Sequence, residues 1–278
     1  MGELYQSLAE KAREIRYSTM EMLGNLGVGH VGGSLSVVDA LVVLYYKHMQ
    51  IDPRNPQKAD RDRFVLSKGH AGPALYAVLA DKGYFPKEML DTLNRPGTRL
   101  PSHADMQRTP GIDMTTGALG QGLSCALGIA AGSKLKQDGA FVYAMIGDGE
   151  SQEGQIWEAA MYAAQLGLDN LIVMTDFNGL QIDGTVAEVN GLEPLDKKWE
   201  AFGWDVAVVD GHDLEAIDLA ITHAKASSGK PSMIILKTRK GKGVSFVEAA
   251  LTANHNMPLS AEQTEQALRE LSEGGEPV

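Results

Sequence analysis

The stretch Phe141–Gln181, FVYAMIGDGESQEGQIWEAAMYAAQLGLDNLIVMTDFNGLQ, decides the fold of this chain. It begins with an apolar run, Phe141–Ile146, passes through a Gly-Asp-Gly turn into a helical stretch, and reaches a second apolar run, Leu171–Thr175. A strand, a helix and a strand of these lengths form a βαβ unit with parallel strands and a right-handed crossover. The stretch therefore predicts an α/β fold, an open and mostly parallel sheet with helices on both faces.

Polar side chains follow both predicted strands of this unit. Asp148 comes just after the first apolar run, beyond Gly147, and Asn178 comes just after the second, beyond Asp176 and Phe177. Because parallel neighbours end at the same edge, where open α/β sheets bind ligands, we expect the two side chains to meet there. A carboxylate and an amide oxygen suit a hard divalent cation such as Mg²⁺, which usually leaves part of its coordination shell to phosphate. The pair predicts a metal and phosphate site.

Composition narrows the class of protein. The chain has 278 residues, 44% hydrophobic and 22% charged, and shows no linker or internal repeat, so we expect one domain over residues 1–278. Residues 183–194 should form a loop. Residues 260–278 should form a last helix and a tail, because Ser260-Ala261-Glu262-Gln263 resembles a capping box. The net charge of −11 argues against nonspecific binding of nucleic acid.

Cellular location is predicted from what the sequence lacks. No apolar run approaches the roughly 20 residues that span a bilayer. The amphipathic start of the chain has mixed charge, unlike a secretory signal. The single cysteine, Cys125, excludes an internal disulfide framework. We expect a cytoplasmic protein that binds neither membrane nor nucleic acid.

Four segments share one design, in which glycines and a polar residue come before the start of a helix. They lie at His30, His70, Gly117 and Asp148. Helix N-termini favour anions, and glycine lets the backbone approach a ligand closely. Such turns are common singly, but four of them beside the predicted metal pair indicate a bound anion. In the first of these segments, Ser34 or Ser36 should cap a helix over 37–49.

Histidines fall into two groups. His48 and His223 lie inside predicted helices, where a structural role is expected. His212 should serve the loop before a helix, and a role near the ligand is the alternative. The others lie near glycine or proline at predicted strand or helix ends, and they are His30, His70, His103 and His255. Histidines there can bind phosphate and move protons from sugar hydroxyls. Without His-x-x-x-His spacing or a partner cysteine they are not zinc ligands.

Several motifs together carry a family resemblance. They are Gly147-Asp148-Gly149 with Asn178 thirty positions after Asp148, Gly29-His30, Lys68-Gly69-His70-Ala71, Thr115-Thr116-Gly117-Ala118-Leu119-Gly120-Gln121-Gly122 and Asp210-Gly211-His212-Asp213. The first resembles the thiamine-diphosphate-binding signature, and the set resembles transketolases over nearly the whole chain. Full-length transketolases continue with two more domains, so the resemblance is to the N-terminal, pyrophosphate-binding half. His30-Val31 and the Glu150 that follows Gly149 resemble split transketolases, which are made from two polypeptides.

The resemblance implies roles for individual residues. Asp148, Asn178 and the backbone carbonyl of Leu180 would hold Mg²⁺ or Ca²⁺ between the cofactor phosphates. The residues that would contact thiamine diphosphate are His30, His70, Gly117, Leu119, Gly147, Asp148, Gly149, Glu150, Asn178 and His255. The catalytic groups would be His30, His70, His103, His255 and Glu153.

The roles of two pairs of charged residues have two interpretations each. Glu153 and Glu158 match acidic positions that the family places in a proton-conducting network at the subunit interface. Alternatively, they are solvent-facing carboxylates that the dipole favours at a helix start. Lys240 and Lys242, in a glycine- and lysine-rich stretch over 237–256, would help with anionic groups or belong to a solvated, flexible loop.

The function implied by the resemblance is transfer of a two-carbon glycolaldehyde unit from a ketose or its phosphate to an aldose, as in pentose phosphate metabolism. Mg²⁺ and thiamine diphosphate would be the cofactors. The family's missing glutamate and aromatic pocket would come from a C-terminal-half partner, with two copies of each chain in a heterotetramer. The donor stays open among pentose phosphates, a branched-sugar phosphate and a sulfonated ketose.

Other functions remain open on the sequence alone. The alpha subunit of a 2-oxoacid dehydrogenase shares the metal signature and also needs a partner. Deoxyxylulose-phosphate synthase is normally one longer chain. A non-catalytic subunit that only binds thiamine diphosphate or its partner is the alternative from another class.

Overall fold

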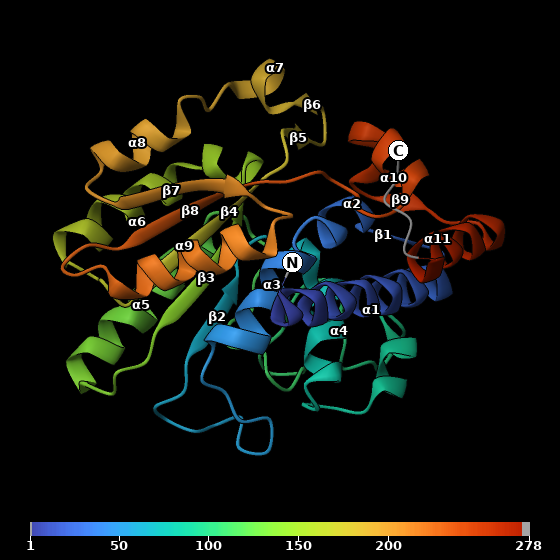
Figure 1. Ribbon diagram of the computed structural model, residues 1–278, viewed down its shortest axis with the longest axis horizontal. Helices are drawn as coiled ribbons and strands as arrows, with labels where there is room; N and C mark the ends of the chain where they lie inside the picture. Colours follow the sequence, from blue (N-terminus) through green and yellow to red (C-terminus); the bar gives the residue numbers. More distant parts are fainter. Residues whose placement is uncertain (1, 274–278) are drawn as a thin grey trace.

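Five parallel strands form the central sheet of the protein, in a computed structural model that describes residues 2–273 (Figure 1). In spatial order they are β2 (Arg63–Leu66), β3 (Val142–Gly147), β4 (Leu171–Phe177), β8 (Ser232–Lys237) and β7 (Asp205–Asp210). β3 and β4 pair in parallel, with Gly147 opposite Asp176, and helix α6 (Gly154–Gln165) connects them in the sequence. The predicted βαβ unit and parallel sheet are confirmed.

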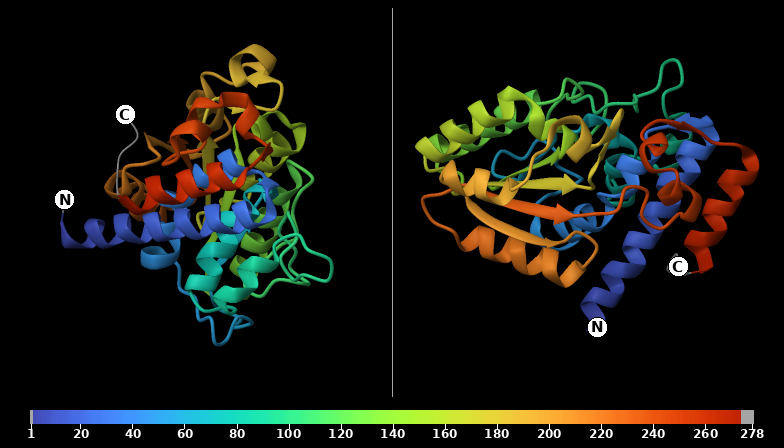
Figure 2. Two further views of the ribbon diagram at one scale, coloured as in Figure 1. Left: turned by 90° about the vertical axis from the view of Figure 1, so that its right-hand side faces the viewer. Right: turned by 90° about the horizontal axis from the view of Figure 1, so that it is seen from above.

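Each face of the sheet packs against a separate hydrophobic core. Along β3, Val142, Ala144 and Ile146 face one core, while Tyr143 and Met145 face the other. Figure 2 (right) shows α5 and α6 on one side of the sheet and α9 on the other. Because both faces are buried, the central strands are continuous apolar runs, which is why the sequence located them.

The α-helices surround this sheet on both sides. Those not yet given are α1 (Glu3–Leu26), α2 (Val31–Leu35), α3 (Val38–Val43), α4 (Gly72–Asp81), α5 (Gln121–Lys136), α7 (Val186–Asn190), α8 (Leu195–Ala201), α9 (Leu214–Ala226), α10 (Ser245–Ala249) and α11 (Ala261–Glu273). The other helices are a π-helix, η1 (Leu44–His48), and four 3-10 helices, η2 (Gly69–Ala71), η3 (Lys87–Thr92), η4 (Gly149–Gln152) and η5 (Leu251–Asn254). Among the helices described, none is long and apolar enough to cross a membrane.

The first and last helices of the described chain lie side by side, because α11 packs along α1 (Figures 1 and 2). The short strands β1 (Val28–Gly29) and β9 (Met257–Pro258) pair antiparallel next to them. The predicted capping box opens α11: the Ser260 hydroxyl accepts from the Gln263 amide at 3.2 Å, and Gln263 Oε1 accepts from the Ser260 amide at 3.0 Å. The predicted tail, 274–278, lies outside the described residues.

The helix expected over 37–49 is present as α3 and the π-helix η1 that directly follows it, but the predicted cap was wrong, because neither Ser34 nor Ser36 caps it. Both serines are buried in a segment that is already helical from Val31, so their hydroxyls donate elsewhere, to the His30 carbonyl at 2.7 Å and to Asp176 at 2.8 Å.

Two stretches that were expected to be loops contain short helices. Residues 183–194 contain β6 (Gly184–Thr185), which pairs antiparallel with β5 (Leu180–Gln181), and the helix α7. A Thr185–Glu188 capping box opens α7, and the Thr-x-x-Glu pattern that signals it is present in the sequence. Residues 237–256 fold into α10 and η5, because buried side chains in this stretch, such as Asn254 and Val247, pack into the molecule.

Candidate active site

The segments that follow β3 and β4 meet at the C-terminal edge of the sheet. Asp148 is buried there, and its carboxylate accepts from the Gly149 amide at 2.7 Å and from the Gly179 amide at 2.6 Å. Burial, together with the neighbouring charge of Asp176, raises the pKa of Asp148 to about 6. The structure thus brings Asp148 beside the Asn178–Leu180 turn, as the strand order requires.

Asn178 is oriented by a buried carboxylate that the sequence motifs do not single out. Its Nδ2 donates to Asp176 at 3.0 Å, and its Oδ1 accepts from the Leu180 amide at 3.1 Å. Although burial raises the pKa of Asp176, the Lys68 ammonium 2.5 Å away outweighs it and holds that pKa below its ordinary value. Asp176 therefore stays charged and fixes which end of the amide is the oxygen.

Four histidines from distant segments form one cluster beside this edge. The His30 ring centroid lies 5.4 Å from that of His70, 5.5 Å from that of His103 and 5.3 Å from that of His255. Burial, with nearby positive charge, lowers the pKa of His30 and of His255 to about 4. Burial also lowers the pKa of His70 and of His103. Each ring is neutral near pH 7, so it offers one proton donor and one acceptor.

Lys240 lies in the same site. From the sequence alone, its place in the site could not be told from a place in a solvated loop. Its side chain is buried, and the residue is only 4% exposed. The ammonium lies 3.3 Å from the Leu180 carbonyl oxygen and 3.2 Å from His255 Nδ1. Burial, followed by repulsion from Lys68, lowers the pKa of Lys240 to about 8. Lys242, in contrast, lines a separate cavity outside this site.

Glu150 ties three of the site's loops together. It is buried, and its carboxylate accepts from the Ser67 hydroxyl at 2.5 Å, the Gly120 amide at 2.9 Å and the Gly147 amide at 3.0 Å. These partners stand at the ends of β2 and β3 and before α5. Burial raises the pKa of the Glu150 carboxyl. Within this chain Glu150 braces the loops, and its contact with a cofactor stays a prediction.

The remaining predicted residues lie at the rim. A Cβ on Gly117, whose φ is 145°, would be 3.4 Å from the His103 ring, so this glycine lies against the histidine cluster. A Cβ on Gly149 would be 2.8 Å from Gln181 Oε1. Leu119 is 39% exposed, and Glu153 and Glu158 are exposed at and after the start of α6. Their outward positions leave both interpretations of the glutamates open.

The oxygen atoms at the edge fit a hard cation. Asp148 offers a carboxylate, Asn178 an amide oxygen, and Leu180 a backbone carbonyl that already accepts from a cationic ammonium. Such ligands suit Mg²⁺ or Ca²⁺. Within residues 2–273, no group of three or more His, Cys, Asp or Glu side chains could hold a metal ion. A cation here would therefore complete its shell with oxygens from a bound phosphate or water.

Comparison with known proteins identifies the family of this chain. Residues 7–276 match the family model described as transketolase, thiamine diphosphate binding domain. The transketolase structure from Campylobacter jejuni superposes with a TM-score of 0.90 at 34% identity, over 98% of this chain and 43% of that one. The chain belongs to the transketolase family, and it spans less than half the length of the full transketolases it matches.

Several relatives of matching length are named as transketolase subunits. The 6-deoxy-6-sulfo-D-fructose transketolase subunit SqwG of Clostridium sp. (strain MSTE9) is 58% identical, over 99% of this chain and 100% of that protein. An apulose-4-phosphate transketolase subunit of Phocaeicola vulgatus is 41% identical, over 96% and 95%. The chain therefore corresponds to the thiamine-diphosphate-binding subunit of a two-subunit transketolase, and the predicted resemblance to the N-terminal half of a split transketolase is confirmed.

Proposed function

We propose that this subunit supplies the diphosphate-binding wall of an active site that transfers a two-carbon glycolaldehyde unit from a ketose to an aldose. The observation that carries the proposal is the meeting of Asp148, Asn178 and the Leu180 carbonyl beside four neutral histidines. A cation-and-diphosphate anchor next to groups that exchange protons with sugar hydroxyls is what this transfer requires.

The anchor would work through oxygen ligands and one buried ammonium. Asp148, Asn178 and the Leu180 carbonyl would hold Mg²⁺, and Ca²⁺ could replace it. The amide of Gly149 and the ammonium of Lys240 would bind the phosphate oxygens. Gly117 and Leu119 would contact the aminopyrimidine ring, and Gly147 and Glu150 would also contact the cofactor. When bound, thiamine diphosphate supplies the electron sink for breaking a carbon–carbon bond.

The histidines would handle the substrate's protons. His103 would donate a hydrogen bond to the reacting oxygen, and His30, His70 and His255 would line the path to it. Because their pKa values lie below neutrality, each ring is neutral at pH 7, so it can accept a proton without first losing one and can donate one hydrogen bond. Glu153, exposed at the start of α6, would join a proton-conducting contact with a neighbouring subunit.

The donor we propose is a sulfonated ketose of the 6-deoxy-6-sulfofructose type. Support comes from the 58% identity to a subunit named for that sugar, against 41% to one named for apulose 4-phosphate. In the transfer the C2–C3 bond of the ketose breaks, C1 and C2 pass to the aldehyde carbon of the acceptor, and a sulfonated aldose shorter by two carbons is released. A pentose phosphate donor is the less supported alternative.

The assembly we propose contains a C-terminal-half partner and two copies of each chain, in the cytoplasm. The partner would supply the wall around the aminopyrimidine. Support for a partner comes from the relatives named as subunits and from full transketolases that are more than twice as long as this chain.

The test of the donor is a panel assay on the reconstituted two-subunit enzyme, with thiamine diphosphate and Mg²⁺. We expect kcat/KM for 6-deoxy-6-sulfofructose to exceed that for apulose 4-phosphate and for a pentulose phosphate. A higher kcat/KM for either phosphate would overturn the donor assignment and leave the transfer itself in place. Release of carbon dioxide from pyruvate would instead favour a 2-oxoacid dehydrogenase subunit.

A further inference from the structure

His212 belongs to a motif that the proposed chemistry does not use, yet it makes three hydrogen bonds. It lies in the turn between β7 and α9, where its own amide donates to Asp210 at 2.9 Å. Its Nδ1 lies 2.7 Å from Asp39 Oδ2, and its Nε2 accepts from the backbone N–H of Arg239 at 2.8 Å. Because Nε2 accepts, the ring proton must be on Nδ1 and is donated to Asp39.

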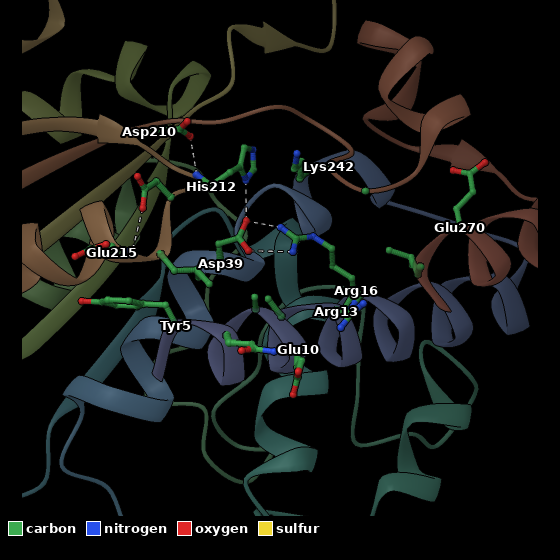
Figure 3. Close-up of a pocket in the computed structure, with 17 residues that line it drawn as sticks. Tyr5, Glu10, Arg13, Arg16, Asp39, Asp210, His212, Glu215, Lys242 and Glu270 are labelled. Atoms are coloured by element: carbon green, nitrogen blue, oxygen red, sulfur yellow. Dashed lines mark hydrogen bonds and ion pairs between the residues drawn. The ribbon is translucent and has the colours of Figure 1, made fainter. Parts of the chain in front are cut away.

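Asp39 is itself held by Arg16, as Figure 3 shows. Arg16 on α1 meets the Asp39 carboxylate on α3 through two guanidinium nitrogens, and both side chains are buried. Burial alone would raise the pKa of Asp39, but Arg16 and His212 bring it down to about 2. A carboxylate that stays charged keeps the His212 ring in one orientation and one tautomer.

The backbone that His212 holds leads directly to the cofactor site. Arg239 precedes Lys240, whose ammonium lies 3.3 Å from the Leu180 carbonyl. On the other side of Lys240, the Gly241 amide donates to the Gly32 carbonyl at 3.0 Å. The Arg239 side chain points elsewhere, to Glu248 at 2.9 Å. In these contacts His212 therefore holds the main chain of Arg239 and not its side chain.

We propose that His212, oriented by Asp39 and Arg16, is a positioning residue for the thiamine diphosphate site. It fixes the main chain at Arg239 so that the Lys240 ammonium is aimed at the phosphate oxygens beside the Leu180 carbonyl. This inference rests on the proposed function of that edge. His212 itself touches neither the predicted metal ligands nor the histidine cluster.

Loss of His212 should leave the protein folded. Asp39 and His212 line a cavity of about 770 Å³ that also reaches Tyr5, Lys242 and Glu270 (Figure 3). After His212→Ala, water from this cavity can bind the Arg239 amide, and the buried Asp39 carboxylate keeps its Arg16 partner. We expect the substitution to make the Lys240 side chain more mobile, and not to leave the buried Asp39 charge unpaired.

The experiment is a double-mutant cycle on the thiamine diphosphate dissociation constant, measured by titration calorimetry on the reconstituted two-subunit enzyme with Mg²⁺. His212→Ala should weaken binding about 10-fold, as outer-shell changes do. His212→Gln, which keeps an acceptor and a donor, should recover most of the affinity. His212→Ala added to Lys240→Ala should cause no further loss. Equal affinity in His212→Ala and wild type, or additive losses, would overturn the proposal.

Two controls separate this inference from the proposed function. Arg239→Ala removes the contact with Glu248 but keeps the amide that His212 binds, so it should bind the cofactor as wild type does. Asp148→Ala should abolish binding. If Asp148→Ala binds the cofactor normally, the proposed function fails. If Asp148→Ala loses binding but His212→Ala binds normally, only the positioning role of His212 fails. Amide exchange over 237–256 in the cofactor-free chain should be faster in His212→Ala.

Discussion

The Asp148 carboxylate carries the largest single task in the proposed site. It is buried, receives two backbone amides and has an amide oxygen and a carbonyl oxygen nearby for a shared cation. Asp148→Asn keeps the size and one acceptor oxygen but removes the charge that a divalent ion needs. Substitution of residues that only hydrogen-bond a metal ligand already lowers metal affinity or activity by about 10–100-fold. For a direct ligand we therefore expect Mg²⁺-dependent thiamine diphosphate affinity to fall by about 100-fold or more.

Calorimetric titration of the reconstituted enzyme measures this loss. Asp183→Asn is the matched control, because Asp183 is exposed in the turn after β5. It should bind as wild type does. An affinity of Asp148→Asn within about threefold of wild type would show that Asp148 is not a metal ligand, because loss of a direct ligand lowers affinity by more than this.

Single residues were predictable from sequence where a strand end or a glycine turn placed them. Asp148, Asn178 and His70 are such cases, and the structure brings their segments together. Lys240 was not decidable, because its burial depends on how residues 237–256 pack, and a basic stretch has the same sequence pattern in solvent. His212 was left open between a role in its loop and a role near the ligand, since its bond to the Arg239 amide joins segments 27 residues apart.

At the scale of elements, the N-terminus of α5 packs unusually closely on the end of β2. A Cβ on Gly122 would lie 2.4 Å from the Ser67 hydroxyl and 2.7 Å from the Ser67 Cα. Gly122→Ala must therefore displace the helix or the strand end, at a cost of about 1–3 kcal/mol. Gly128→Ala on the same helix, where nothing lies within 4 Å of the added Cβ, should stabilise by up to about 1 kcal/mol.

Urea unfolding of the two variants measures both changes in the free energy of unfolding. Opposite signs are expected. Destabilisation by Gly128→Ala, or a neutral effect of Gly122→Ala, would contradict the close packing of α5 on β2.

Elements were predictable where burial on two faces left an unambiguous apolar run, as in β3 and β4. The break between α3 and η1 was not, because the sequence from Val37 to Met49 keeps helical spacing through the π-turn. The short helix α7 carries its own capping signal, Thr185 with Glu188, but five residues are too few for a periodic apolar pattern.

For the whole molecule, the neutral histidine cluster predicts how stability depends on pH. In the unfolded chain a histidine takes up its proton near pH 6.5, whereas the pKa of folded His30 and His255 is about 4. The unfolded state therefore binds more protons between these values. The cluster's contribution is complete above pH 6.5 and falls as the pH drops toward 4.

Urea midpoints of the cofactor-free chain at about pH 7.5 and about pH 5, on either side of the unfolded histidine pKa, measure this loss. His30→Gln, which cannot take up a proton, should lose less stability over the interval than wild type. A steeper loss in the variant would mean that His30 is charged in the folded protein.

The central claim is that this chain forms one wall of a transketolase active site and that a partner forms the other. The most direct measurement is the rate of two-carbon transfer by this chain alone, by the C-terminal-half partner alone and by their mixture, with thiamine diphosphate and Mg²⁺. Only the mixture should turn over, and the mixture made with Asp148→Asn should not. Turnover at an ordinary enzymatic rate by this chain alone, or by the Asp148→Asn mixture, would contradict the account.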